Sequence, residues 1–284
     1  MNLNFSMYSG FSSLVKKHGI EYAAKTAKEF GFSSVEFFDV AGAANRVPTF
    51  EGVEDAKIAK AVLDKYSLSV ACYSVGASLV TLDKDVNIID SVVSDLKRYG
   101  EIAASLGCPY LHHTLILNLS LKDGAPSLDE VLLPTVNAAC EVADHCKKLG
   151  VTCIYEDQGM YFNGVFGFGR FFDEMKKRCD NVGVCGDIGN VLFVDEEPLP
   201  FFEAFIHDIK HVHLKDYKRV TRECKLKSRG GIFLEGAPLG IGGIDVKSCL
   251  KTLYDHGYCG AFAIEDEFIN ELPATFSYVD KHFC

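Results

Sequence analysis

Carboxylate and imidazole side chains stand at the ends of four neighbouring β-rich runs in the second half of the chain. Glu156, Asp187 and Glu265 each end one such run, and the run between the last two carries His211 and His213. The two histidines point the same way in a strand, because strand side chains alternate between faces. Three carboxylates brought together repel one another unless a cation is present. If the fold makes these ends meet, the set suits a divalent metal such as Mn²⁺ or Mg²⁺.

Taken one at a time, these residues have simpler explanations. A single glutamate at a strand end is commonly a cap or a salt-bridge partner. Four consecutive runs that all end in metal-ligand types nevertheless favour one functional site over four unrelated structural roles.

The elements that must position these residues are predicted by short β-rich runs that alternate with longer amphipathic stretches. We expect eight strands, at Leu3–Met7, Ser34–Phe38, Leu68–Ser74, Pro109–Thr114, Val151–Glu156, Val182–Asp187, Ile209–Leu214 and Gly260–Glu265. We expect helices between them, among others at Ile20–Phe30, Asp85–Leu106, Leu128–Leu149 and Val246–His256. Strands alternating with helices predict a parallel sheet, and eight such units predict an α/β fold of the (β/α)₈ TIM-barrel type. Active sites of these barrels lie at the carboxyl ends of the strands.

Two segments depart from the regular alternation. A connection of roughly 30 residues, Lys215–Gly243, follows the seventh strand, and connections of that length are usually functional. Its first half, Lys215–Arg229, holds seven basic and two acidic residues. It is expected to bind a phosphorylated substrate or an acidic neighbouring subunit, or to be a solvated loop. The tail Phe268–Cys284 is expected to pack a last helix on the outside, and residues 1–284 to form a single TIM-barrel domain.

Composition limits the class of protein. The chain has 284 residues, of which 48% are apolar, and 29 basic against 39 acidic residues give a net charge of −10. This composition is globular, and the acidic charge argues against nucleic-acid binding that relies on overall positive charge. No apolar run reaches the ~20 residues of a membrane span, and no signal peptide is recognisable. The eleven cysteines are scattered without a CxxC pair, which favours a cytoplasmic location over a disulfide scaffold.

Several motifs of the second half resemble one known superfamily. They are YEDQG at 155–159, CGDIGN at 185–190, HVHLKD at 211–216, LGIGGID at 239–245 and GYCGAFAIEDE at 257–267. Together they are similar to motifs of the xylose-isomerase-like TIM-barrel superfamily. That group includes sugar phosphate isomerases and epimerases, ketose 3-epimerases, hydroxypyruvate isomerase, inosose dehydratase and endonuclease IV. The first half of the chain shares only the layout.

The resemblance implies one divalent metal held by Glu156, Asp187, His213 and Glu265. Mn²⁺ is the expected ion, with Mg²⁺, Co²⁺ or Zn²⁺ as alternatives. It further implies that Glu156 and Glu265 are the catalytic acid and base. One would remove the proton beside a ketose carbonyl to give a cis-enediolate, and the other would return a proton. His211 is expected to lie deeper, where it either belongs to the core or supports the ligands.

One motif departs from the family pattern. Many members have Asp-x-x-His after the sixth strand, whereas here Asp187 is followed three residues later by Asn190. Asn190 is therefore expected to contact substrate, because an amide hydrogen-bonds a hydroxyl well but ligates a metal poorly. The chain also lacks an Asp-x-His motif after the seventh strand. Together with the acidic charge, this argues against DNA repair of the endonuclease IV type.

Other polar residues near the strand ends are expected to bind substrate or to have structural roles. Lys215 shares the parity of His213 and is expected to meet a phosphate or an enediolate oxygen. His112 and His113 end the fourth strand, and only one of them can face the barrel. The residues assigned to substrate binding are Asn190, Lys215, His113, Glu36 and Tyr73.

We therefore predict a metal-dependent isomerase or epimerase of a sugar or sugar phosphate. One alternative is a dehydratase or lyase that uses the same enolate, such as an inosose dehydratase or the barrel subunit of a C-glycoside deglycosylase. The other alternative is a non-catalytic sugar-binding barrel. The expected partners are a small-molecule sugar and further copies of the chain in a homo-oligomer, or a small partner subunit in the deglycosylase case. We expect no nucleic-acid or membrane partner.

Overall fold

The structure is a computed structural model that describes residues 4–42, 46–80, 86–117 and 125–265, together with residues 275, 278 and 281. Its strands are β1 (Asn4–Met7), β2 (Ser34–Val40), β3 (Ser69–Gly76), β4 (Tyr110–His113), β5 (Thr152–Glu156), β6 (Val182–Asp187), β7 (Ile209–Leu214), β8 (Asp216–Val220), β9 (Leu226–Lys227), β10 (Phe233–Ala237) and β11 (Ala261–Ile264). Its helices are α1 (Phe11–His18), α2 (Ile20–Glu29), α3 (Val53–Lys65), α4 (Val86–Ser105), α5 (Leu128–Lys148), α6 (Gly164–Arg178), the 3₁₀ helix η1 (Asn190–Val194), α7 (Pro198–Phe205) and α8 (Val246–Asp255).

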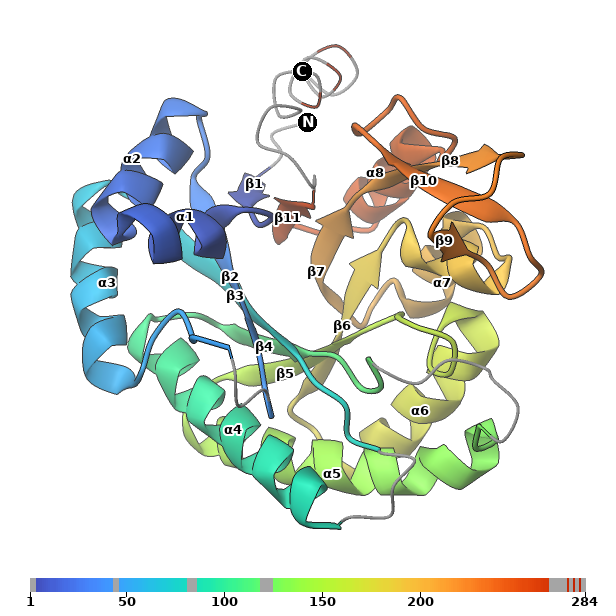
Figure 1. Ribbon diagram of the computed structural model, residues 1–284, viewed down its shortest axis with the longest axis horizontal. Coiled ribbons are helices and arrows are strands. Elements are labelled where there is room, and N and C mark those ends of the chain that lie inside the picture. The colour runs from blue at the N-terminus through green and yellow to red at the C-terminus, as the bar shows by residue number, and fades with distance from the viewer. Residues whose placement is uncertain are drawn as a thin grey trace.

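Eight of the strands close into a parallel barrel, which confirms the (β/α)₈ TIM-barrel prediction (Figure 1). Their order around the barrel is β1-β11-β7-β6-β5-β4-β3-β2. All eight predicted strands are present, each within two residues of its expected bounds. The four helices named from the sequence are found within one residue of theirs. Helices and parallel strands alternate because the chain must cross from the end of one strand back to the start of the next.

The barrel interior is layered. Cys72, Ile154 and Cys185 form a small apolar cluster that is separate from the large core between strands and helices. Two positions further along β3, β5 and β6, the inward side chains are polar and belong to Ser74, Glu156 and Asp187. The barrel thus has an apolar floor with buried polar groups above it, toward the carboxyl ends of the strands.

The long connection after β7 is not an irregular loop. It forms a separate antiparallel sheet in the order β8-β10-β9, drawn in orange in Figure 1. Asp216 anchors the turn that follows, because its carboxylate accepts hydrogen bonds from the backbone amides of Tyr217, Gly240, Gly242 and Ile244. The sequence did not predict this sheet, since its short strands carry many charged residues and lack a clear alternation.

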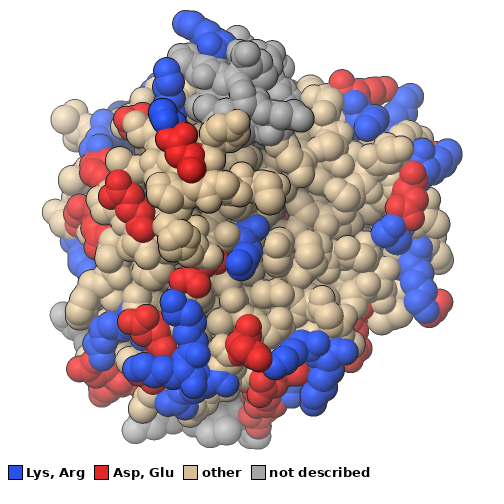
Figure 2. Space-filling model, turned by 180° about the vertical axis from the view of Figure 1, so that it is seen from behind, with Lys and Arg blue, Asp and Glu red and all other residues tan. Residues whose placement is uncertain are grey.

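Two arginines of this connection pair with acidic neighbours. Arg219 pairs with Glu197, and Arg222 pairs with Glu235. These contacts favour the solvated interpretation of the segment over a phosphate-binding loop. On the face shown in Figure 2, charged side chains of both signs lie mostly around the edge.

Two further predictions concern membrane-spanning segments and the C-terminal helix. None of the helices in the described ranges is long and apolar enough to cross a bilayer. The helix expected within 268–284 lies outside the described residues, apart from three isolated positions.

Candidate active site and metal centre

The four predicted ligands meet at the carboxyl ends of neighbouring strands. Glu156 ends β5, Asp187 ends β6, His213 lies near the end of β7, and Glu265 follows β11. One ligand atom of each lies within 4.8 Å of the others. Glu265 is 30% exposed, whereas the other three are buried. The cluster follows from the barrel order, because β11, β7, β6 and β5 are consecutive.

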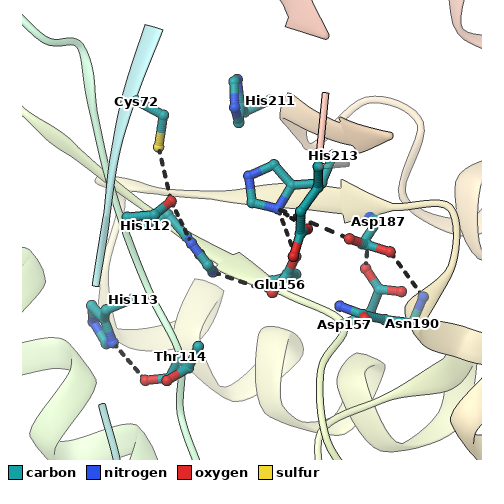
Figure 3. Close-up of polar contacts among 12 residues, drawn as sticks. Cys72, His112, His113, Thr114, Glu156, Asp157, Asp187, Asn190, His211 and His213 are labelled. Carbon is teal, nitrogen blue, oxygen red and sulfur yellow. Dashed lines mark hydrogen bonds and ion pairs between the residues drawn. The ribbon is translucent and has the colours of Figure 1, made fainter. Parts of the chain in front are cut away.

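His213 turns one ring nitrogen toward the three carboxylates (Figure 3). Its Nδ1 lies 2.7 Å from Glu156 Oε1 and 3.9 Å from Asp187 Oδ2. The same atom lies 3.8 Å from Glu265 Oε2. On the opposite edge of the ring, Nε2 lies 3.0 Å from Glu36 Oε1. The imidazole is therefore held from both edges, with Nδ1 at the centre of the cluster.

The Lys215 ammonium also lies among these carboxylates. Its Nζ is 2.9 Å from Asp187 Oδ2 and 2.7 Å from Glu265 Oε2. It donates a hydrogen bond to Asn190 Oδ1 at 3.2 Å. Burial lowers the pKa of Lys215, but the charges of Asp187 and Glu265 outweigh it and raise the pKa well above its usual value. Lys215 therefore contributes a fixed positive charge, and both Lys215 and Asn190 stand at the site where they are expected.

Glu156 has the electrostatic character of a proton-transfer group. Burial raises the pKa of Glu156 to about 7, against the opposing effect of His213. Burial lowers the pKa of His213, but Cys185, Glu36 and Glu156 outweigh it and raise the pKa well above its ordinary value. A carboxyl group with a pKa near neutrality can both accept and donate a proton, as general acid–base catalysis requires.

Two residues predicted to bind substrate point away from the barrel interior. Tyr73 faces the helix layer, where its hydroxyl donates to Asp39 at 2.7 Å and its ring stacks on Phe37. His113 also faces outward, with its ring edge against Tyr155 at 5.2 Å between centroids. Burial lowers the pKa of His113 to about 4, so it is neutral in the core. Both predictions are wrong, because these side chains have the opposite parity to the inward-facing ones.

Glu36 faces inward but has no access to substrate. It is completely buried, and its carboxylate contacts His211, His213 and Ser74. The strand β2 continues to Val40, so Glu36 lies deep in the barrel rather than at a strand end. The prediction that it contacts a sugar hydroxyl is therefore wrong. His211 lies beside it, below the ligands, where it is expected.

His112 is the histidine of β4 that faces the barrel. Its Nδ1 lies 2.8 Å from Ser74 Oγ, and its Nε2 lies 3.6 Å from Glu156 Oε2. Burial lowers the pKa of His112 well below its ordinary value, so the ring is neutral. The sequence contains the signal for this residue, since one of two adjacent histidines must face inward, but it does not say which.

A cavity of about 620 Å³ opens beside the cluster, within the range of small-molecule sites. Tyr8 lines it and stacks on the His213 ring, with centroids 4.7 Å apart. Sequence reasoning missed Tyr8, although its place directly after β1 marks it as a residue of the barrel mouth. The remaining polar lining includes Thr114, Gln158 and Glu265.

The donor set suits a divalent cation. It offers three carboxylates and one imidazole nitrogen, and hard oxygen-rich sets of this kind bind Mn²⁺, Mg²⁺ and related ions. Carboxylates packed this closely are stabilised by a cation. The residues that would hold the ion are Glu156, Asp187, His213 and Glu265.

Comparison with known proteins places the chain in a family. It belongs to the xylose isomerase-like TIM barrel family, whose model matches residues 24–276. It is 34% identical over 101 residues to an inosose dehydratase of Clostridium botulinum, covering 34% of this chain and 34% of the relative. It is 37% identical over 79 residues to an L-ribulose-5-phosphate 3-epimerase of Salmonella paratyphi C, covering 28% of this chain and 24% of the relative. The matches thus span about a third or less of these relatives.

Solved structures show the same fold over nearly the whole chain. A xylose isomerase domain protein from Planctomyces limnophilus superposes with a TM-score of 0.74 at 17% identity, covering 98% of this chain and 95% of its own. A xylose isomerase-like TIM barrel protein from Mycobacterium smegmatis, in complex with magnesium, superposes with a TM-score of 0.66 at 16% identity. The superposition covers 99% of this chain and 96% of the other. At these identities the likeness shows the fold alone.

Proposed function

We propose that the protein is a divalent-metal-dependent isomerase or epimerase that acts on a keto sugar or its phosphate. The main support is that the carboxylates of Glu156, Asp187 and Glu265 lie around Nδ1 of His213. A cavity opens beside this cluster. The epimerase among the curated relatives supports the substrate class. Mn²⁺ is the proposed ion, and the magnesium held by a structural relative supports divalent metal binding in general.

The proposed chemistry needs two proton-transfer groups and a way to acidify a C–H bond. A bound divalent ion would supply Lewis-acid polarisation of substrate oxygens. Glu156, whose pKa lies near 7, is suited to remove the proton beside the carbonyl. Glu265, partly exposed in the cavity, would return a proton to the same carbon or to its neighbour. The first outcome is epimerisation and the second is isomerisation.

Lys215 and Asn190 would orient the substrate and balance charge. The Lys215 ammonium is a permanent donor next to both proposed ligands Asp187 and Glu265. Asn190 Nδ2 is buried and has no partner among the described residues, so it can donate to a substrate oxygen. Both groups lie where negative charge develops on an enediolate, and preorganised donors at such a place lower the barrier.

A dehydratase is the second candidate, and Lys215 is the observation that favours it. Its ammonium contacts Glu265 at 2.7 Å, so it could donate a hydrogen bond to a leaving hydroxyl, while the proton taken up by Glu156 would depart with that oxygen as water. The inosose dehydratases among the curated relatives support this alternative.

Hydrogen exchange in D₂O tests the proposed function. The protein is loaded with Mn²⁺ and incubated with a panel of ketoses, ketose phosphates and inosose. An isomerase or epimerase is expected to place deuterium beside the carbonyl without other change in mass, whereas a dehydratase releases water. Absence of exchange and of elimination on every substrate, in protein shown to hold metal, would contradict both enzymatic candidates and favour a sugar-binding barrel.

The free cysteines support a reducing compartment. The cysteines of the described part of the chain are all free, and most of them are buried. We therefore propose a cytoplasmic location, since structural thiols of this kind persist where disulfides are not formed.

A further inference from the structure

We propose that Glu36 is a positioning residue that selects Nδ1 of His213 as the metal-binding nitrogen. The inference rests on the proposed metal site and concerns a side chain that does not touch it. Glu36 comes from β2, which is separated from β7 by β11 and β1 around the barrel, and its carboxylate is completely buried. Burying a carboxylate costs hydration free energy unless hydrogen bonds to its neighbours replace those lost to water. The partners of Glu36 therefore indicate what this residue does.

Three side chains donate to the Glu36 carboxylate. His213 Nε2 lies 3.0 Å from Oε1, and His211 Nε2 lies 2.7 Å from Oε2. Ser74 Oγ donates to Oε1 at 2.5 Å. With two imidazole nitrogens and one hydroxyl around it, the Glu36 carboxylate is the acceptor of all three hydrogen bonds.

An acceptor at Nε2 determines the tautomer of His213. An imidazole that binds a metal has lost its extra proton, and the neutral ring carries one N–H and one lone pair. With the hydrogen on Nε2, bonded to Glu36, the lone pair is on Nδ1 and points at the carboxylate cluster. In the absence of Glu36, the hydrogen can sit on Nδ1 instead, where Glu156 Oε1 at 2.7 Å accepts it. That tautomer has no lone pair on the metal side.

The same carboxylate is connected to a second ligand. Ser74 Oγ also contacts His112 Nδ1 at 2.8 Å. His112 Nε2 in turn lies 3.6 Å from Glu156 Oε2, as Figure 3 shows for the labelled pair. Glu36 thus stands at one corner of a closed polar ring that runs through five strands, β2, β3, β4, β5 and β7. Supporting carboxylates of this kind orient metal-binding histidines in many proteins, and their loss weakens metal binding.

Metal affinity tests the inference without depending on turnover. The Kd for Mn²⁺ is measured by titration calorimetry for the wild type and for Glu36→Gln. The isosteric amide can turn its NH₂ group toward Nε2 and favour the wrong tautomer, so a loss of about 10- to 100-fold is expected. The matched control is His211→Gln, which removes another partner of Glu36 but leaves the His213 contact, and a loss below about tenfold is expected.

A double-mutant cycle separates positioning from general damage to the core. The His213→Ala background lacks the tight site, and Glu36→Gln is expected to have no further effect on the weaker Mn²⁺ binding that remains, because the coupled group is already gone. Glu36→Asp keeps a carboxylate acceptor, so its Mn²⁺ affinity is expected to lie between those of the wild type and Glu36→Gln. This variant also tests the inference if Glu36→Gln does not fold. Equal affinity of wild type and folded Glu36→Gln, or additive losses in the cycle, would overturn the inference. A wild type that binds no Mn²⁺ would instead refute the proposed function.

Discussion

Replacing Glu156 by glutamine is expected to lower kcat by at least about 100-fold, the scale of general acid–base catalysis. The amide cannot take up or release the proton that the carboxyl group exchanges. Glu265→Gln is expected to have an effect of the same order, because catalysis on two faces of the substrate needs both groups. Turnover is measured on the substrate found by the exchange screen and is expressed per bound metal, since both glutamates are also proposed ligands.

The control for these variants is Glu203→Gln, a change at an exposed glutamate of α7. It removes one negative charge from the protein but none from the site, and kcat is expected to stay unchanged. Activity of both site variants within a few-fold of the wild type would show that Glu156 and Glu265 do not transfer the proton.

Substitution of Lys215 by methionine is expected to separate metal binding from catalysis. The change removes a positive charge that lies 2.9 Å from Asp187 and 2.7 Å from Glu265. Because a cation repels a second cation, Mn²⁺ is expected to bind as tightly as in the wild type or more tightly. Turnover is expected to fall by about 100-fold or more, the usual cost of one donor that stabilises developing negative charge. Calorimetry and steady-state kinetics measure the two effects on the same preparation.

The exposed Lys218 of the neighbouring strand β8 provides the matched control. Lys218→Met is expected to change neither the Kd nor kcat. If Lys215→Met lost its metal, the lysine would be a structural support for the ligands. If it kept full activity, the proposed role of Lys215 toward substrate would be wrong.

The barrel could be predicted because its signal is repeated. Each strand is a short buried run, and runs such as Lys147–Glu156 join a helix end, a glycine and a strand in one short stretch. Gly150 takes a positive φ of 72° there, a conformation that glycine adopts without steric cost. The sheet β8-β10-β9 could not be predicted in this way. Its strands place few apolar residues on the core, Leu234 among them, and these residues follow no recognisable period.

Site residues that end a strand could be predicted from the sequence. Those for which one must know which face of the strand points into the barrel could not. Glu156 and Asp187 are the last residues of their strands, so the barrel itself brings them together. The strand β4 is only four residues long, too short to reveal which of its two histidines faces inward. Tyr73 was misplaced because a polar aromatic side chain suggests substrate contact. The inward positions of β3 are in fact held by the small side chains of Cys72 and Ser74, and the large ring packs in the helix layer.

The most direct test of the account is the stoichiometry of Mn²⁺ binding. Protein stripped of metal is titrated with Mn²⁺, and the wild type is compared with Asp187→Ala and His213→Ala. We expect about one tight site per chain in the wild type and loss of that site in both variants, because each removes one donor from a set of four. Absence of a tight site in the wild type, or undiminished binding in both variants, would contradict the metal centre on which the proposed function depends.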